Sequence, residues 1–181
     1  MLTLRGSAAL SDFRKNALLR TLQEVGAPVT DLAATFLHLV HIATPLSPEQ
    51  HDVLTRLLTY GPRRTPQNST DNDTLLIVTP RPGTISPWSS KATDIARICG
   101  LSNILRIERA IEFRLSLDHP TEQHLEVVRT RIHDRMIQSV FDNPASLPTL
   151  FTRQSPRPLT TIPVLENGRT ALEKANRDLG L

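Results

Sequence analysis

The chain has 181 residues, of which 39% are hydrophobic, and its 21 basic and 18 acidic side chains give a net charge of +3. This length suits one domain with a buried core. The chain has no long apolar run that predicts a transmembrane helix, and its single cysteine, Cys99, excludes an internal disulfide. The calculated isoelectric point of 9.6 does not indicate nucleic-acid binding, because the basic residues alternate with acidic ones instead of clustering.

The first third of the chain predicts a strand–helix–strand–helix unit from its hydrophobic spacing and its turn residues. The second of these helices has a clear start, where Ser47, Pro48 and Gln50 occupy the positions of a capping box. The N-terminus does not have the layout of a signal peptide, so a cytoplasmic protein is the simplest interpretation. We expect a strand at 2–5, a helix at 8–25, a strand at 35–42 and a helix from Ser47 onward.

The same order returns after residues 61–73, which contain almost nothing apolar and are expected to form an exposed connection. Two similar halves, 1–60 and 74–141, therefore predict an α+β fold: a largely antiparallel sheet with helices packed on one side. In the second half we expect a strand at 74–79, a helix at 90–99, a strand at 104–117 and a helix at 121–141.

The pattern changes after Phe141, where five prolines follow within a short distance. We expect a proline-rich, largely extended linker at 142–165, with a further edge strand near 160–165 as one option. Residues 166–181 are expected to begin the domain that follows, with a short helix at 168–179.

The loop from Thr79 to Asp94 combines three prolines, the only tryptophan and a run of hydroxyl side chains. One interpretation is a stiff connection with Ser89 or Ser90 as the helix N-cap and Trp88 as a packing residue. The other is a cradle for a phosphate or carboxylate, made by backbone N–H groups at the helix start together with nearby hydroxyls and Lys91. The loop is not a P-loop, since no second glycine precedes the lysine.

The strand at 104–117 contains an anomaly, because alternation places Arg109 on the apolar face. One interpretation is a paired structural arginine, or a β-bulge that turns it outward. The other is a guanidinium directed at a partner domain or a phosphate-bearing substrate.

The remaining reactive side chains do not form a recognisable site. His38 and His41 are three apart on a strand and should point to opposite faces, and no histidine pattern indicates a metal. Cys99 is expected to be a small buried hydrophobe. No motif for a nucleotide loop or a serine nucleophile occurs, so no catalytic residue and no metal ligand are predicted.

The residues themselves resemble a known family. TPRPGTISPWSSKATDIARICGL at 79–101 is the longest such stretch, and RIERAIEF at 106–113 and HDRM at 133–136 add to it. The opening LRGSAALSDFR and the closing GRTALEKANRDLGL are similar to the same family. These stretches resemble the large, single-chain form of phosphoribosylformylglycinamidine synthase, also called formylglycinamide ribonucleotide amidotransferase, of purine biosynthesis. The similarity covers its N-terminal domain and the start of the linker that follows.

The resemblance implies that the two halves correspond to a small-subunit dimer fused into one chain. The parent enzyme would be a cytoplasmic, monomeric ligase that uses ATP, Mg²⁺ and glutamine to make formylglycinamidine ribonucleotide, with its cysteine glutaminase and ATP-binding domains outside these 181 residues. These 181 residues would bind no cofactor and no nucleic acid, and they would not associate with a membrane. It would be a non-catalytic domain that docks the synthetase and glutaminase domains of its own chain. Residues expected at the edge of the synthetase site are Arg81, Thr84, Ser86, Trp88, Ser89, Ser90, Lys91, Arg106 and Arg109.

Two other functions are compatible with the sequence. One is a stand-alone protein-interaction module with no catalytic role, which a stop codon after Leu181 would support. The other is a small independent anion-binding protein, which a phosphate titration of the chain would test.

Overall fold

The computed structural model describes residues 1–61, 73–152 and 158–179. Its elements follow in the order β1 (Leu2–Ala8), α1 (Asp12–Glu24), β2 (Val29–Ile42), α2 (Pro48–Leu58), β3 (Thr74–Pro80), α3 (Pro87–Ile98), β4 (Ile104–Leu117), α4 (Glu122–Ile132), β5 (Gln138–Phe141), the 3₁₀ helix η1 (Pro144–Phe151) and α5 (Val164–Leu179).

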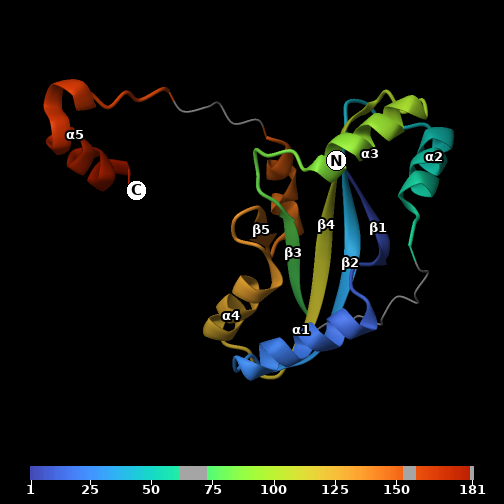
Figure 1. Cartoon of the computed structure of the whole chain (residues 1–181). Coiled ribbons are helices and arrows are strands. Elements are labelled where there is room, and N and C mark those ends of the chain that lie inside the picture. The colour runs from blue at the N-terminus through green and yellow to red at the C-terminus, as the bar shows by residue number, and fades with distance from the viewer. Residues whose placement is uncertain (62–72, 153–157, 180–181) are drawn as a thin grey trace.

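The strands form one sheet in the order β1-β2-β4-β3-β5, and every neighbouring pair is antiparallel. The two long strands β2 and β4 form its centre, where Leu37 lies opposite Ala110. Figure 1 shows the sheet with α1 and α4 at one end and α2 and α3 at the other. The α+β fold and the repeated strand–helix–strand–helix order are thus confirmed.

The four helices α1 to α4 cover one face of the sheet through two hydrophobic clusters. In the first cluster, Leu22 of α1 and Val128 of α4 pack with Leu32 of β2. In the second, Leu54 of α2 and Ala96 of α3 pack with Val40 of β2. Because Leu32 and Val40 are an even number of residues apart on one strand, they point to the same face. Each helix pair therefore combines one helix from each half of the chain.

The opposite face of the sheet is covered in part by η1. Leu147 and Leu150 are 2% and 0% exposed, and they pack with Leu37, Leu39 and Ile77. The expectation of an extended linker from residue 142 was therefore wrong for this stretch. The prolines of 144–151 do not prevent a 3₁₀ turn, and each fully buried leucine contributes roughly 1.5–3 kcal/mol from removal of apolar surface from water.

Several boundaries differ from the sequence expectations, and β2 begins at Val29 instead of residue 35. α1 begins at Asp12 with Ser11 as its N-cap, because β1 continues through Ala8. The helix expected at 121–141 ends at Ile132, where His133 is extended and Asp134 accepts backbone N–H bonds that close a turn into β5. Local side-chain bonds of this kind compete with a continuing helix.

The other predicted elements agree with the structure in part. The capping box at Ser47 and the strand at 104–117 are confirmed. No edge strand forms near 160–165; instead α5 begins at Val164 and is kinked at Gly168, which has a φ of 53°. The exposed connection expected at 61–73 lies almost entirely outside the described residues. Figure 1 shows α5 standing apart from the sheet, and no helix among the described residues is both long and apolar enough to cross a membrane.

Candidate functional site

The start of α3 lies at Ser86, three residues before the earlier of the two N-caps that the sequence suggested. The Ser86 hydroxyl accepts the N–H of Ser89 at 3.0 Å, and Pro87 takes the first helical position, where its fixed φ is suitable. Before the helix, Thr84 donates both its N–H and its hydroxyl to the Arg81 carbonyl, which closes a tight turn. Gly83 within this turn has a φ of 82°, a conformation that favours glycine.

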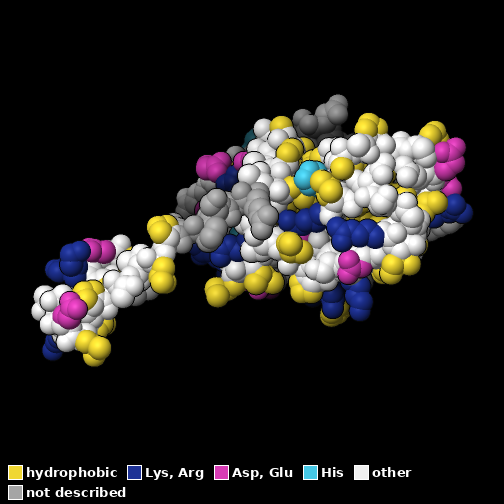
Figure 2. Space-filling view, turned by 90° about the horizontal axis from the view of Figure 1, so that it is seen from above, with side chains coloured by type: hydrophobic (Ala, Val, Ile, Leu, Met, Phe, Trp, Pro, Cys, Tyr) yellow, Lys and Arg dark blue, Asp and Glu magenta, His cyan; other side chains and the backbone are white. Residues whose placement is uncertain are grey.

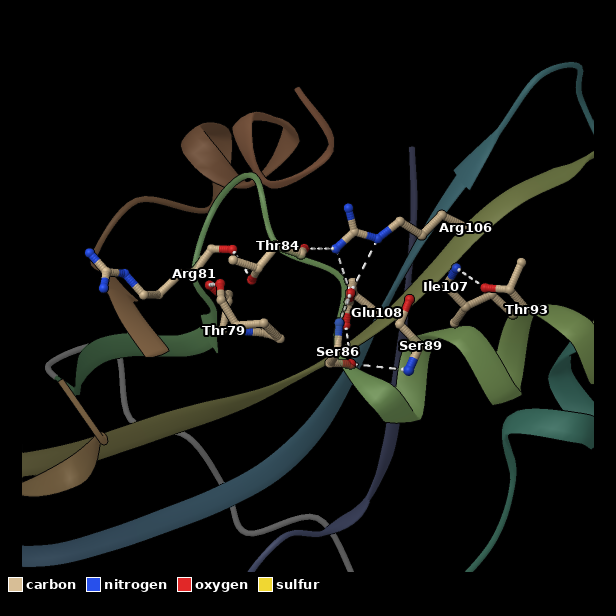
Figure 3. A network of polar contacts seen from close by, with 10 residues as sticks. Thr79, Arg81, Thr84, Ser86, Ser89, Thr93, Arg106, Ile107 and Glu108 are labelled. Atoms are coloured by element: carbon tan, nitrogen blue, oxygen red, sulfur yellow. Dashed lines mark hydrogen bonds and ion pairs between the residues drawn. The ribbon is translucent and has the colours of Figure 1, made fainter. Parts of the chain in front are cut away.

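A buried carboxylate, Glu108 of β4, holds this loop in place. Glu108 is 0% exposed and accepts the Ser86 N–H at 3.1 Å and the Ser86 hydroxyl at 2.8 Å. Arg106 donates to the same carboxylate and to the Thr84 carbonyl, so a single ion pair bridges the strand, the turn and the helix start (Figure 3). The negative charge at the N-terminus of α3 is thus supplied by the chain itself.

Strand alternation places Glu108 on the face of β4 opposite to that of Arg109, and no sequence motif marks it as important. The available signal was its position two residues after Arg106 on the same side of the strand, opposite a loop rich in hydroxyl groups. That spacing allows an ion pair but does not show that the pair will be buried.

Two further hydroxyl groups join α3 to β4. The Thr93 hydroxyl accepts the backbone N–H of Ile107 at 3.0 Å in a buried bond (Figure 3). Ser89 is also fully buried, and its hydroxyl has no hydrogen-bond partner among the described residues. Ser89 therefore faces the interior rather than the surface of the loop.

Arg109 lies on the helix face of the sheet, as the alternation predicted. Its guanidinium carbon is 4.5 Å from the ring centre of Phe36 and 4.8 Å from that of Trp88, and Nη1 donates to the Tyr60 hydroxyl at 3.4 Å. No carboxylate among the described residues pairs with it. Arg109 stays in register opposite His38, since the irregularity of β4 falls near Arg106 instead. The aromatic rings provide cation–π contacts in place of an ion pair.

His38 completes this group. It is 1% exposed, its Nε2 lies 2.8 Å from the Tyr60 hydroxyl, and its ring stacks on Trp88. Burial, and then the positive charge of Arg109, lowers the pKa of His38 to about 4, so the imidazole is neutral at pH 7. His41 points to the opposite face as expected, where its ring contacts Phe151 of η1.

The nine candidate interface residues differ in accessibility. Figure 2 shows Lys and Arg side chains gathered on the face of the molecule seen from above the α2–α3 end. Ser89 is the one buried candidate, and Ser86, Trp88, Arg106 and Arg109 are half-buried. The exposed candidates are Arg81, Thr84, Ser90 and Lys91.

Two stretches distant in sequence meet at the tip of the loop. The Arg81 N–H donates to the Ile137 carbonyl at 3.1 Å, and its guanidinium donates to the Met136 carbonyl at 3.3 Å. Ile85, Met136 and Ile137 are 64%, 79% and 64% exposed. We call Arg81, Ile85, Met136 and Ile137 the loop–β5 surface.

Cys99 is exposed, so the expectation of a buried cysteine was wrong. It is the C-cap of α3, where Gly100 with a φ of 84° turns the chain and Leu101 takes the buried position. Within the described ranges, no group of three metal-ligating side chains gathers.

A family model described as formylglycinamide ribonucleotide amidotransferase N-terminal matches residues 35–151. This chain belongs to that family. The resemblance seen in the sequence is confirmed, and the chain belongs in the context of a purine-biosynthesis amidotransferase. The matched residues run from within β2 to Phe151, the last residue of η1, and include the loop, Glu108, Arg109 and the loop–β5 surface.

Proposed function

We propose that this chain is the N-terminal, non-catalytic part of a formylglycinamide ribonucleotide amidotransferase, in which it docks the glutaminase and synthetase domains together. The parent enzyme would use ATP, Mg²⁺ and glutamine to convert formylglycinamide ribonucleotide to the formylglycinamidine. The loop from Thr79 to Lys91 would border the synthetase site. Membership of the family supports the identity of the parent enzyme, and the loop–β5 surface supports the docking role.

The single observation that carries this proposal is the meeting of Arg81 with Met136 and Ile137. The stretches 79–101 and 133–136 are two that resemble the family, and Arg81 hydrogen-bonds them into one surface. That surface exposes Met136 and Ile137 beside Arg81, whose guanidinium has no carboxylate partner among the described residues, and the exposed Ile85 follows four residues after Arg81 in the same loop. Exposed apolar side chains grouped in this way are typical of contact with another protein surface.

The rigidity of the loop also supports the proposal. Glu108 fixes Ser86 and, through Arg106, Thr84, while Arg81 fixes the turn to β5. A contact surface that is already ordered loses little conformational entropy on docking. The loop can therefore present Arg81, Ser90 and Lys91 in one geometry.

The test compares glutamine-dependent with ammonia-dependent turnover in the full-length enzyme. Ile85→Glu introduces a charge at the loop–β5 surface, and Phe13→Glu, on α1 at the other end of the sheet, introduces the same charge at a residue that is 77% exposed. We expect Ile85→Glu to lower glutamine-dependent turnover at least tenfold and ammonia-dependent turnover less. Phe13→Glu should leave both within twofold of wild type.

The loop is tested separately with Arg81→Ala and Lys91→Ala. If both variants have wild-type turnover in both reactions, the loop has no role in the enzyme's function. A stop codon directly after Leu181 in the native reading frame would contradict the proposal as a whole and favour a stand-alone interaction module.

A further inference from the structure

A pocket of about 490 Å³ lies between α2 and α3, with Ile107 of β4 among its lining residues. Its apolar wall includes Leu57, Ala92 and Ile95. Its volume falls in the range of small-molecule sites, which are mostly apolar with a few polar groups. The pocket thus has the size and the lining of a binding site for a small organic molecule.

The polar groups of the pocket are gathered around two aromatic side chains. Tyr60, Trp88 and Lys91 all line it. Trp88 and Lys91 are three residues apart on α3 and therefore share a face of that helix. Tyr60 and Trp88 also contact Arg109, which does not itself line the pocket but lies next to this end of it.

Arg109 differs from the other sheet arginines in the described part of the chain. Arg5 and Arg114 pair with Glu112, and Arg106 pairs with Glu108. Arg109 has no carboxylate partner there, and neither has Lys91, which is exposed. The cation–π contacts of Arg109 stabilise its charge but leave it without an anionic partner among the described residues, so it can attract the carboxylate or phosphate of a ligand.

The geometry of Arg109 is also suited to an anion. Phe36 and Trp88 contact the guanidinium through their rings, while its one hydrogen bond within the described ranges goes to the Tyr60 hydroxyl. A planar guanidinium held by rings keeps N–H groups at its edge for bidentate binding of a carboxylate or phosphate. The neighbouring His38, which bonds Tyr60, cannot act as an anionic partner of Arg109, because an imidazole is never negatively charged at accessible pH.

We propose that the α2–α3 pocket binds a small organic anion, with the apolar body of the ligand between the two helices and its carboxylate paired with Lys91 at the end formed by Tyr60 and Trp88, next to the positive charge of Arg109. The pocket shares Pro87, Trp88 and Lys91 with the loop proposed to border the synthetase site, but none of its lining residues belongs to the loop–β5 surface. The ligand site can be tested on the 181-residue chain without any synthetase domain.

The test uses Trp88 as the reporter, since it is the only tryptophan of the chain. The probe is 4-phenylbutyrate, and the matched neutral probe is 4-phenylbutan-1-ol. We expect a saturable change of tryptophan fluorescence with the carboxylate, and a dissociation constant at least tenfold weaker for the alcohol. The proposal would be overturned if both probes saturate with the same dissociation constant. It would also be overturned if fluorescence shows no saturable change up to about 10 mM carboxylate, which corresponds to about 2.7 kcal/mol of binding free energy.

Two variants link the binding to the cations. Arg109→Gln and Lys91→Gln should each weaken the binding of 4-phenylbutyrate at least fivefold and leave the affinity for the alcohol unchanged. Arg97→Gln, an exposed arginine of the same helix that pairs with Asp94, is the matched control and should have no effect. If circular dichroism shows that Arg109→Gln does not fold, the test depends on the exposed Lys91→Gln variant. Wild-type affinity of that variant for 4-phenylbutyrate would refute the site.

Discussion

The buried carboxylate of Glu108 gives the sharpest stability prediction. Glu108→Ala removes the acceptor for the Ser86 N–H, for the Ser86 hydroxyl and for the Arg106 guanidinium, which is 16% exposed in its side chain. Removing one partner of a buried ion pair costs about 3–5 kcal/mol, because the other charge is left without compensation. For a chain of this length, that loss corresponds to a fall of roughly 6–20 °C in Tm.

The assay is urea and thermal unfolding of the 181-residue chain, followed by circular dichroism. Asp52→Ala is the control: it removes an ion pair with Arg56 in which both side chains are mostly exposed, and it should change stability by no more than about 0.5 kcal/mol. The double variant Arg106→Met/Glu108→Leu should recover part of the loss, since no unpaired charge is then buried. A loss below about 1 kcal/mol for Glu108→Ala would refute the argument that this carboxylate anchors the loop.

Further predictions concern the core, the pH dependence and the thiol. Leu150→Ala should destabilise the chain by about 2–5 kcal/mol in urea unfolding, whereas Leu159→Ala, at a residue 95% exposed, should be neutral. The pKa of His38 is about 4 in the folded chain and about 6.5 in the unfolded chain, so the free energy of unfolding should fall by at most about 3 kcal/mol as pH falls from about 6.5 to 4. His38→Gln should remove this pH dependence. If the variant keeps the wild-type pH profile, His38 is not its source. Gly6→Ala should cost about 1–3 kcal/mol, because its Cβ would lie 2.7 Å from Cε1 of His38; wild-type stability would show that the ring can move. Native protein should react with Ellman's reagent at one thiol without denaturant, and an unreactive Cys99 would contradict its exposure.

Hydrophobic spacing was sufficient for the repeated α+β order, because the residues that form the core follow the helical and strand periods. The position of Arg109 on the helix face also followed from alternation alone. The sequence did not predict what surrounds it, since Phe36 of β2, Tyr60 after the end of α2 and Trp88 of α3 come together only in the tertiary fold.

The failures have a common physical cause in contacts between distant residues. Leu147 and Leu150 stand in a proline-rich stretch, and only the uncovered face of the sheet makes a buried 3₁₀ helix favourable there. Ser86 was passed over as an N-cap because Ser89 and Ser90 are equally good candidates by residue type. The choice depends on Glu108, which is 22 residues away from Ser86 in the sequence and accepts its N–H.

The pairing of helices across the two halves has a consequence for folding. α1 shares its cluster with α4, and α2 shares its cluster with α3, so neither half contains a complete hydrophobic cluster of its own. A chain that ended after α2 would leave the apolar faces of both its helices and the inner edge of β2 without their partners. One half alone should therefore be unable to unfold or refold independently, and the whole sheet should melt as one cooperative unit. Two separately expressed halves should instead assemble on mixing, through the same antiparallel pairing of β2 with β4 that joins them within one chain.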